Sequence, residues 1–115
     1  MSTSTPPVAA IDCGTNSIRL LIASLDEQGG IVERARKLEL VRLGQGVDAT
    51  GAFHPDALQR TFDACEKYRH LIEASGCDTI RFVATSAARD VSNRDEFEAG
   101  VRPVSYTHLT LPTSD

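Results

Sequence analysis

The chain has 115 residues, of which 41% are hydrophobic, so it can form one small domain with a thin core. Its formal net charge of −4 and the lack of any dense Lys/Arg cluster argue against a protein that binds nucleic acid by bulk electrostatics. The N-terminal segment has neither a basic region nor a long apolar stretch, which argues against a signal peptide and a membrane span and favours a cytoplasmic protein.

The order of the elements predicts an α/β fold with a mixed sheet. Residues 8–11 form a continuous apolar run, which predicts a strand over 8–12 that is buried on both faces. Residues 18–25 and 31–43 predict two further strands, joined by a turn at 26–30. The first three strands therefore form an antiparallel meander, followed by a glycine-punctuated loop at 44–51.

A long helix is predicted after this loop. Pro55 suits the first turn of a helix and Gly76 suits its end, so the helix extends to about Ser75. Its apolar stripe is expected to pack on the sheet. Residues 79–85 predict a fourth strand, which this crossover helix would place parallel to the first strand.

The most informative segment is Ile-Asp-Cys-Gly-Thr-Asn-Ser at 11–17, which lies between two apolar runs. Asp12 closes the first strand, and Gly14 has no side chain to block a close approach. The small residues that follow offer backbone N–H groups and side-chain donors to an anion. The pattern predicts a phosphate-binding loop. An ordinary turn between two strands is the alternative, because the same residue types are favoured there.

Three segments resemble the Ppx/GppA family of exopolyphosphatases and guanosine pentaphosphate phosphatases. They are Ala-Ala-Ile-Asp-Cys-Gly-Thr-Asn-Ser-Ile-Arg-Leu-Leu-Ile at 9–22, Val-Arg-Leu-Gly-Gln-Gly-Val-Asp at 41–48 and Val-Ala-Thr-Ser-Ala-Ala-Arg-Asp-Val-Ser-Asn at 83–93. The first pattern alone is shared in looser form with sugar kinases and other actin-like ATPases, whereas the three in order are specific. The resemblance implies an actin-like, ribonuclease-H-like fold.

The resemblance also implies roles for particular residues. The first phosphate-binding loop would consist of Gly14, Thr15, Asn16 and Ser17. Asp12 would hold a Mg²⁺ ion directly or through water. Arg89 would reach a substrate phosphate, with Asn93 nearby, although both residues could instead cap the junction between the fourth strand and the next helix. Such groups suit the hydrolysis of a phosphoanhydride, which depends on charge neutralisation.

According to the resemblance, residues 8–101 form an incomplete domain of this family. The family's Gly-x-Glu-Glu-Ala segment, whose first glutamate activates water, and its second glycine-rich phosphate loop do not occur in these 115 residues. We therefore expect no catalytic residue in the chain and an inactive fragment. Residues 1–7 are expected to be disordered, the helix at 93–97 barely begins, and the Thr-, Ser- and Pro-rich residues 102–115 are expected to be an artefactual or disordered tail.

The expected function of the complete protein is Mg²⁺-dependent removal of the terminal phosphate from polyphosphate or of the 5′ phosphate from guanosine pentaphosphate. We expect no nucleic-acid or membrane partner, and the resemblance leaves a homodimer open. Two alternatives are a non-catalytic phosphate- or nucleotide-binding module and, at lower probability, a fragment of an actin-like sugar or acetate kinase. The loop at 42–48 is expected to be mainly structural, with a role next to the substrate left open.

The three cysteines are predicted to be reduced. They are odd in number and lack the C-x-x-C spacing of a zinc site. Cys13 has no histidine close by in the sequence and is expected to point into the sheet, which argues against a nucleophilic role.

Overall fold

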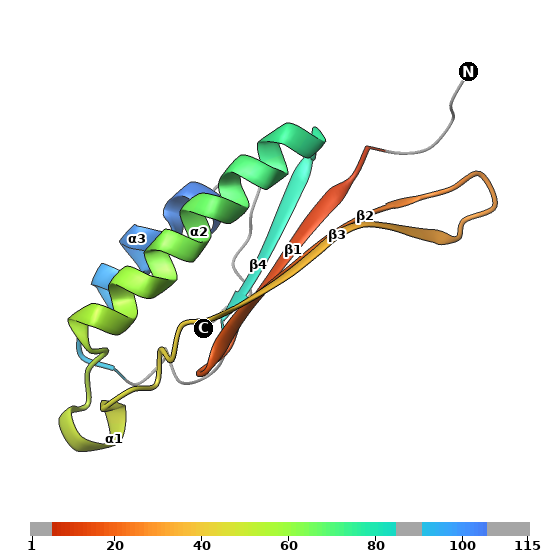
Figure 1. Cartoon of the computed structure of the whole chain (residues 1–115). Helices are drawn as coiled ribbons and strands as arrows, with labels where there is room; N and C mark the ends of the chain where they lie inside the picture. Colours follow the sequence, from red (N-terminus) through yellow and green to blue (C-terminus); the bar gives the residue numbers. More distant parts are fainter. Residues whose placement is uncertain (1–5, 85–90, 106–115) are drawn as a thin grey trace.

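The structure is a computed structural model that describes residues 6–84 and 91–105 (Figure 1). Two helices pack beside a mixed sheet, and a long hairpin extends beyond them. In chain order the elements are β1 (Val8–Cys13), β2 (Ser17–Leu25), β3 (Ile31–Leu40), α1 (Val47–Thr50), α2 (Pro55–Ser75), β4 (Thr79–Ala84) and α3 (Arg94–Ser105).

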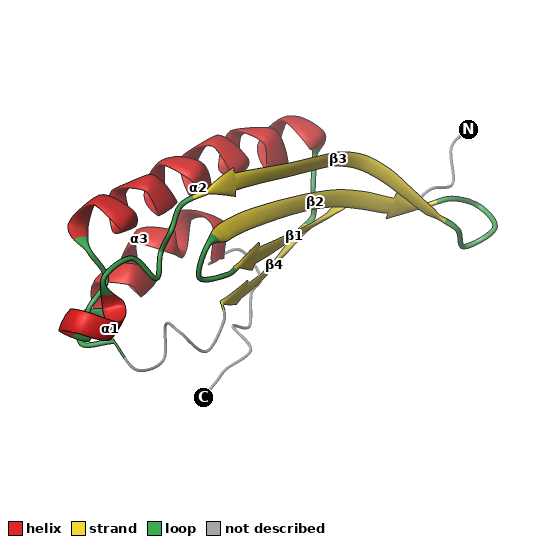
Figure 2. Cartoon of the chain, turned by 60° about the horizontal axis from the view of Figure 1, so that its bottom comes forward, coloured by secondary structure: helices red, strands yellow, loops and turns green. Residues whose placement is uncertain are grey.

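The sheet has the strand order β3-β2-β1-β4 (Figure 2). β1 pairs antiparallel with β2, and β2 pairs antiparallel with β3, whereas β1 and β4 are parallel. Parallel neighbours cannot be joined by a tight turn, and the long helix α2 precedes β4 as the crossover connection. The predicted α/β class, the three-strand meander, the crossover helix and the fourth strand are confirmed.

The bounds of α2 agree with the prediction. His54 precedes the helix, and its Nδ1 accepts a hydrogen bond of 3.0 Å from the backbone N–H of Asp56. Pro55 occupies the first helical position, where its missing N–H has no cost. At the other end Gly76 has a φ of 72°, a left-handed conformation that glycine adopts without steric penalty.

The sheet is buried on one face only. In β1, Ala9, Ile11 and Cys13 are buried, while the residues between them are exposed. The prediction that the first strand is buried on both faces is therefore wrong. The physical reason is that α2 and α3 contact each other and the same side of the sheet, and none of the described elements covers the opposite side (Figure 1).

The core lies between this sheet face and the two helices. Tyr68 on α2 is buried, and its hydroxyl donates a hydrogen bond of 2.8 Å to the carbonyl oxygen of Ile18 on β2. This bond satisfies the one polar atom of a large buried ring. The other buried hydrophobic residues of β2, α2 and β4 are Ile18, Leu20, Ile22, Ala57, Leu58, Ala64, Cys65, Ile72, Ile80 and Phe82.

The β2–β3 hairpin contains a register shift. Ile22 is paired with Ala35, whereas Ala23 is paired with Glu33, so Arg34 is an extra residue on β3. A β-bulge of this kind bends the strand and increases its twist. The hairpin curves along its length in Figure 2, as expected of a bulged pair.

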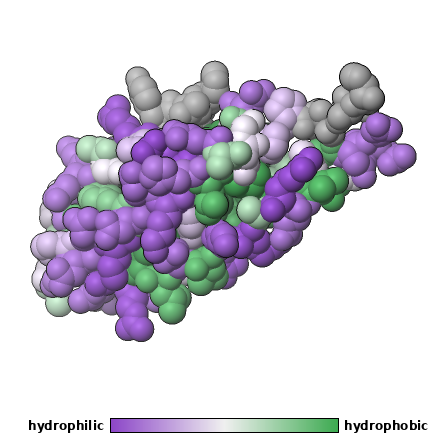
Figure 3. Space-filling model, turned by 45° about the horizontal axis from the view of Figure 1, so that its top comes forward, coloured by the Kyte–Doolittle hydropathy of each residue, from purple (hydrophilic) through white to green (hydrophobic). Residues whose placement is uncertain are grey.

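The surface is mostly hydrophilic in the view of Figure 3, and apolar side chains emerge in separate groups. Within residues 6–84 and 91–105, the large apolar side chains that are exposed all belong to strands: Val8, Leu25, Ile31, Val32, Leu38, Leu40 and Val83. In the part of the chain that the structure describes, no helix is both long and apolar enough to cross a membrane.

Two helical segments differ from the prediction. The loop predicted at 44–51 contains the single turn α1, which is too short to show a helical period in the sequence. The helix expected only to begin at 93–97 continues to Ser105 and includes Pro103 in its last turn. Its buried residues Phe97, Val101 and Val104 lie four and three positions apart on one stripe.

The extension of α3 has a packing cause. Val104 is fully buried, although Pro103 beside it removes a helical hydrogen bond. Proline costs least in the first turn of a helix, so its cost in the last turn of α3 has to be offset, and the packing of α3 against α2 offsets it. Residues 102–105 are thus helical, in contrast to the predicted absence of helical structure beyond Arg102.

We predict that Gly100→Ala destabilises the fold. A Cβ at this position of α3 would overlap the ring of Phe62 on α2. Glycine to alanine in a helix usually gains up to about 1 kcal/mol, whereas overpacking costs about 1–3 kcal/mol. Urea unfolding should show a lower free energy of unfolding for the variant. The double variant G100A/F62L should recover most of the loss, and a more stable G100A protein would contradict the close packing.

Candidate functional site

The candidate site lies at the edge of the sheet where β1 and β4 both end. These parallel strands are in register up to Cys13 and Ala84, so their carboxyl ends share this edge. Asp12 is exposed one residue before the end of β1. The predicted phosphate loop follows directly, between Cys13 and the start of β2 at Ser17.

The loop is a tight turn between two antiparallel strands. The backbone N–H of Gly14 donates a hydrogen bond of 2.8 Å to the carbonyl oxygen of Ser17, which leaves Thr15 and Asn16 at the tip. One of the N–H groups expected to face an anion is therefore used to close the turn. The N–H groups of Thr15 and Asn16 make no hydrogen bond with any described residue, and both residues are exposed.

The carbonyl oxygens of the same loop bind the segment that follows β3. Asn16 O accepts hydrogen bonds from the N–H groups of Val41 and Arg42, at 3.0 and 2.9 Å. Thr15 O accepts a hydrogen bond of 2.8 Å from Gly44 N–H. These bonds end β3 at Leu40, earlier than the predicted residue 43. The first two segments of the family resemblance thus lie side by side.

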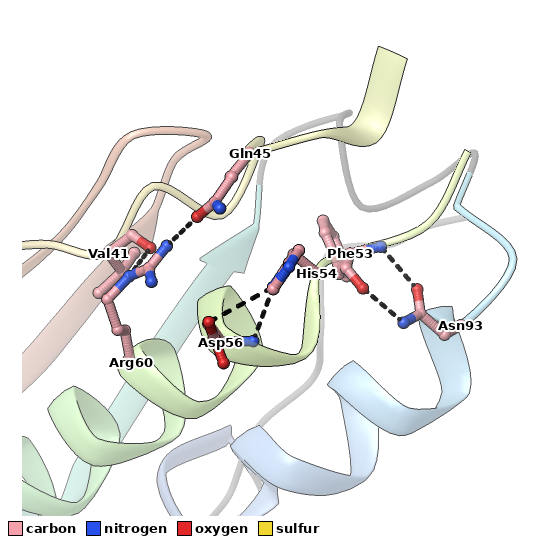
Figure 4. A network of polar contacts seen from close by, with 7 residues as sticks. All are labelled: Val41, Gln45, Phe53, His54, Asp56, Arg60 and Asn93. Atoms are coloured by element: carbon pink, nitrogen blue, oxygen red, sulfur yellow. Dashed lines mark hydrogen bonds and ion pairs between the residues drawn. The ribbon is translucent and has the colours of Figure 1, made fainter. Parts of the chain in front are cut away.

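Arg60 of α2 fixes the second segment from the other side. Its Nε donates a hydrogen bond of 2.9 Å to Val41 O, and its terminal nitrogen donates to the side-chain oxygen of Gln45 (Figure 4). Sequence reasoning missed Arg60, because nothing in its local pattern distinguishes it from the other charged residues of the helix. The polar residues that line the open hollow between the two loops are Thr15, Asn16, Arg42, Gln45, Asp48 and Arg60.

The predicted third segment is only partly described. Arg89 lies outside the described residues. Asn93 precedes α3, and its side-chain amide makes two hydrogen bonds with the backbone of Phe53: Phe53 N–H donates to Oδ1 at 2.9 Å, and Nδ2 donates to Phe53 O at 3.0 Å (Figure 4). The amide therefore fastens the start of α3 to the residue before the N-cap of α2. A phosphate would have to use its remaining N–H.

The surroundings of Asp12 determine how this residue can hold a Mg²⁺ ion. Among the residues that the structure describes, no three His, Cys, Asp or Glu side chains come close enough to enclose a metal ion. The cross-strand neighbour of Asp12 is Arg19. Mg²⁺ is commonly held by one or two carboxylates together with water and substrate phosphate oxygens. The exposed carboxylate of Asp12 fits that mode of binding and does not fit an all-protein cage.

Cys13 faces the core. Burial, with smaller contributions from Cys65 and Asp12, raises the pKa of the Cys13 thiol from 9.0 to about 12. Burial likewise raises the pKa of Cys65 to about 12. Because the thiolate is the nucleophile, both groups are inert near neutral pH. The position of Cys13 agrees with the expectation that its side chain points into the sheet.

We predict that Asn93→Ala lowers the free energy of unfolding by about 1–3 kcal/mol, because it removes both bonds to Phe53 and leaves backbone groups without partners. Asn16→Ala is the matched control, since its side chain is exposed and the change should cost no more than about 0.5 kcal/mol. Urea unfolding of the two variants gives the comparison. An unchanged stability of Asn93→Ala would contradict the structural role of this amide.

The buried thiols give a second prediction. Iodoacetamide at about pH 8 should alkylate Cys77, which is partly exposed, well before Cys13 and Cys65. Above pH 9 the unfolded chain loses thiol protons that the folded chain keeps until about pH 12, so stability should fall as pH rises through this range. Equal labelling rates for Cys13 and Cys77 in the folded protein would contradict this account.

Known proteins are similar to this chain over most of its length. The model of the Ppx/GppA phosphatase family matches residues 21–106. Exopolyphosphatase 2 of Mycobacterium tuberculosis is 55% identical over 95 residues, which cover 80% of this chain and 30% of that protein. Guanosine-5'-triphosphate,3'-diphosphate pyrophosphatase of Vibrio cholerae is 33% identical over 96 residues, or 84% of this chain and 19% of that protein.

A solved structure has the same fold as this chain. The crystal structure of the Aquifex aeolicus member of the Ppx/GppA family superposes with a TM-score of 0.82 and 28% identity, and the match covers 94% of this chain and 35% of that chain. The actin-like fold implied by the resemblance is thereby confirmed. The chain spans about a third of the length of the mycobacterial and Aquifex proteins. The family match covers more than half of the chain, which therefore belongs to the Ppx/GppA phosphatase family.

Proposed function

We propose that this chain supplies the first phosphate-binding loop of a phosphatase that removes the terminal phosphate of inorganic polyphosphate, with guanosine pentaphosphate as the alternative substrate. The observation that carries the proposal is the joined pair of loops at the end of β1, where Thr15 and Asn16 are exposed. The name of the mycobacterial relative, at 55% identity, makes polyphosphate the first substrate to test.

In this proposal the tip of the turn binds phosphate. The N–H groups of Thr15 and Asn16, which bond no described residue, donate to phosphate oxygens, and their side chains add a hydroxyl and an amide. The carbonyl oxygens of Thr15 and Asn16 accept hydrogen bonds from the backbone N–H groups of residues 41–44, and these bonds fix the orientation of the turn. A donor set that is fixed in advance loses little freedom when the anion binds.

A Mg²⁺ ion would be held by Asp12 through its exposed carboxylate. When bound, it would neutralise negative charge on the phosphate groups. Arg19 lies across from Asp12 and adds a positive charge on the same open face of the sheet. Asp12 would hold the ion, and Arg19 would offset part of the negative charge of an anionic ligand.

The 115 residues are proposed to bind phosphate without turnover. The water-activating glutamate of the family pattern does not occur in them, and the chain spans only 30% of the mycobacterial relative. The proposal therefore predicts that the chain binds polyphosphate without releasing phosphate, and the two properties are measured separately.

The binding test is calorimetric titration of the folded chain with tripolyphosphate in the presence and absence of Mg²⁺. We expect binding that is stronger with Mg²⁺, a loss of about tenfold in affinity for Asn16→Ala, and loss of the Mg²⁺ effect for Asp12→Asn. Gln28→Ala is the matched control, because this exposed amide lies in the turn at the opposite end of β2 and should leave binding unchanged.

Two results would overturn the proposal. A folded chain that binds neither tripolyphosphate nor polyphosphate would exclude the phosphate loop. Equal loss of affinity in Asn16→Ala and Gln28→Ala would mean that binding is unrelated to the loop. Release of phosphate at the rate of a complete enzyme would refute only the expected lack of turnover.

A further inference from the structure

The hollow next to the 14–16 turn is lined by two arginines, Arg42 and Arg60, that are not part of the phosphate loop. It is open to solvent, has a volume of about 950 Å³, and includes Thr15 and Asn16 in its wall. A ligand that is bound at the tip of the turn therefore has space to continue into the hollow. Arg42 and Arg60 line it from the 41–48 segment and from α2.

Neither arginine is neutralised by a carboxylate of the described residues. Arg60 donates to two uncharged oxygens, Val41 O and the amide oxygen of Gln45, so no described carboxylate offsets its positive charge. Arg42 makes no side-chain hydrogen bond or ion pair with a described residue, although Asp48 also lines the hollow. By contrast, Arg36 and Arg69 form ion pairs with glutamates at 2.8–3.0 Å.

The backbone at Arg42 is in an unfavourable conformation. Its φ of 51° makes it the one non-glycine residue with a positive φ among those described. The conformation is held by the bonds from Val41 and Arg42 to Asn16 O and by the Gln45 N–H bond of 3.0 Å to Arg42 O. Glycine or asparagine would adopt it at lower cost. A long cationic side chain at such a position is more consistent with a binding role than with a structural one.

We propose that this hollow is a second phosphate subsite, in which Arg42 binds the phosphate groups that follow the terminal one in a linear polyphosphate. The inference rests on the proposed function, because the terminal phosphate occupies the 14–16 turn. Arg60 is a positioning residue that fixes Val41 and Gln45 around Arg42 and contributes its charge. A guanidinium suits this task because it can donate two hydrogen bonds to one phosphate group.

The test compares ligands of different length. Calorimetry with orthophosphate, tripolyphosphate and a long polyphosphate is carried out on the unmodified chain and on Arg42→Gln, which removes the charge without easing the backbone conformation. We expect unchanged orthophosphate binding and a loss of about tenfold for the two longer ligands. Arg42→Lys keeps the charge and should recover part of the loss. Arg34→Gln, on the distant half of the hairpin, changes the net charge equally and should have no effect.

A second variant separates binding from folding. Arg42→Gly removes the side chain and suits the positive φ, so it should bind long polyphosphate as weakly as Arg42→Gln while resisting urea better than the unmodified chain. For Arg60, we expect Arg60→Lys to retain more of the preference for long polyphosphate over orthophosphate than Arg60→Ala does.

The outcomes distinguish the two proposals. If no ligand binds to any folded variant, the proposed function fails and the subsite fails with it. If Asn16→Ala weakens all ligands while Arg42→Gln binds every length like the unmodified chain, the phosphate loop stands and the second subsite is refuted. If Arg42→Gln weakens orthophosphate as much as polyphosphate, Arg42 belongs to the first subsite and the inference is also refuted.

Discussion

The parallel pairing of β1 with β4, in register from Val8 and Thr79 to Cys13 and Ala84, determines how the rest of the molecule is arranged. Because parallel neighbours need a long connection, the 21-residue helix α2 crosses one face of the sheet, and α3 packs beside it. The same pairing brings the carboxyl ends of both strands to one edge. The turn between β1 and β2 lies at that edge, next to the end of β4 at Ala84.

Much of the fold could be predicted from local chemistry. Pro55 marks the start of α2 because its missing N–H has no cost in the first turn, and Gly76 marks the end because glycine adopts the left-handed conformation found there. Burial could not be predicted in the same way, since the apolar run of β1 says nothing about which face a helix covers. The end of α3 was also missed, because the packing of Val104 outweighs the local signal of Pro103.

The candidate site was predictable where its function depends on consecutive residues, as in the 14–17 turn. It was not predictable where the contacts join distant segments. The double hydrogen bond of Asn93 to Phe53 links positions 40 residues apart, and the bonds of Asn16 O reach the segment after β3. The left-handed backbone of Arg42 follows from those bonds, and a sequence pattern gives no sign of it in a residue other than glycine or asparagine.

The bulge at Arg34 also determines where the hairpin can change in length. Side chains alternate between the two faces of a strand, so the loss of one residue normally turns every residue beyond it to the opposite face. Arg34 is paired with no residue of β2 in the register, although its Nε donates a hydrogen bond of 3.2 Å to the hydroxyl of Ser24. Its neighbours Glu33 and Ala35 already pair with the adjacent residues Ala23 and Ile22. Deleting Arg34 would leave each remaining pair opposite its present partner. In the interior of β3, this position is therefore the one at which the loss of a single residue is compatible with the existing pairing.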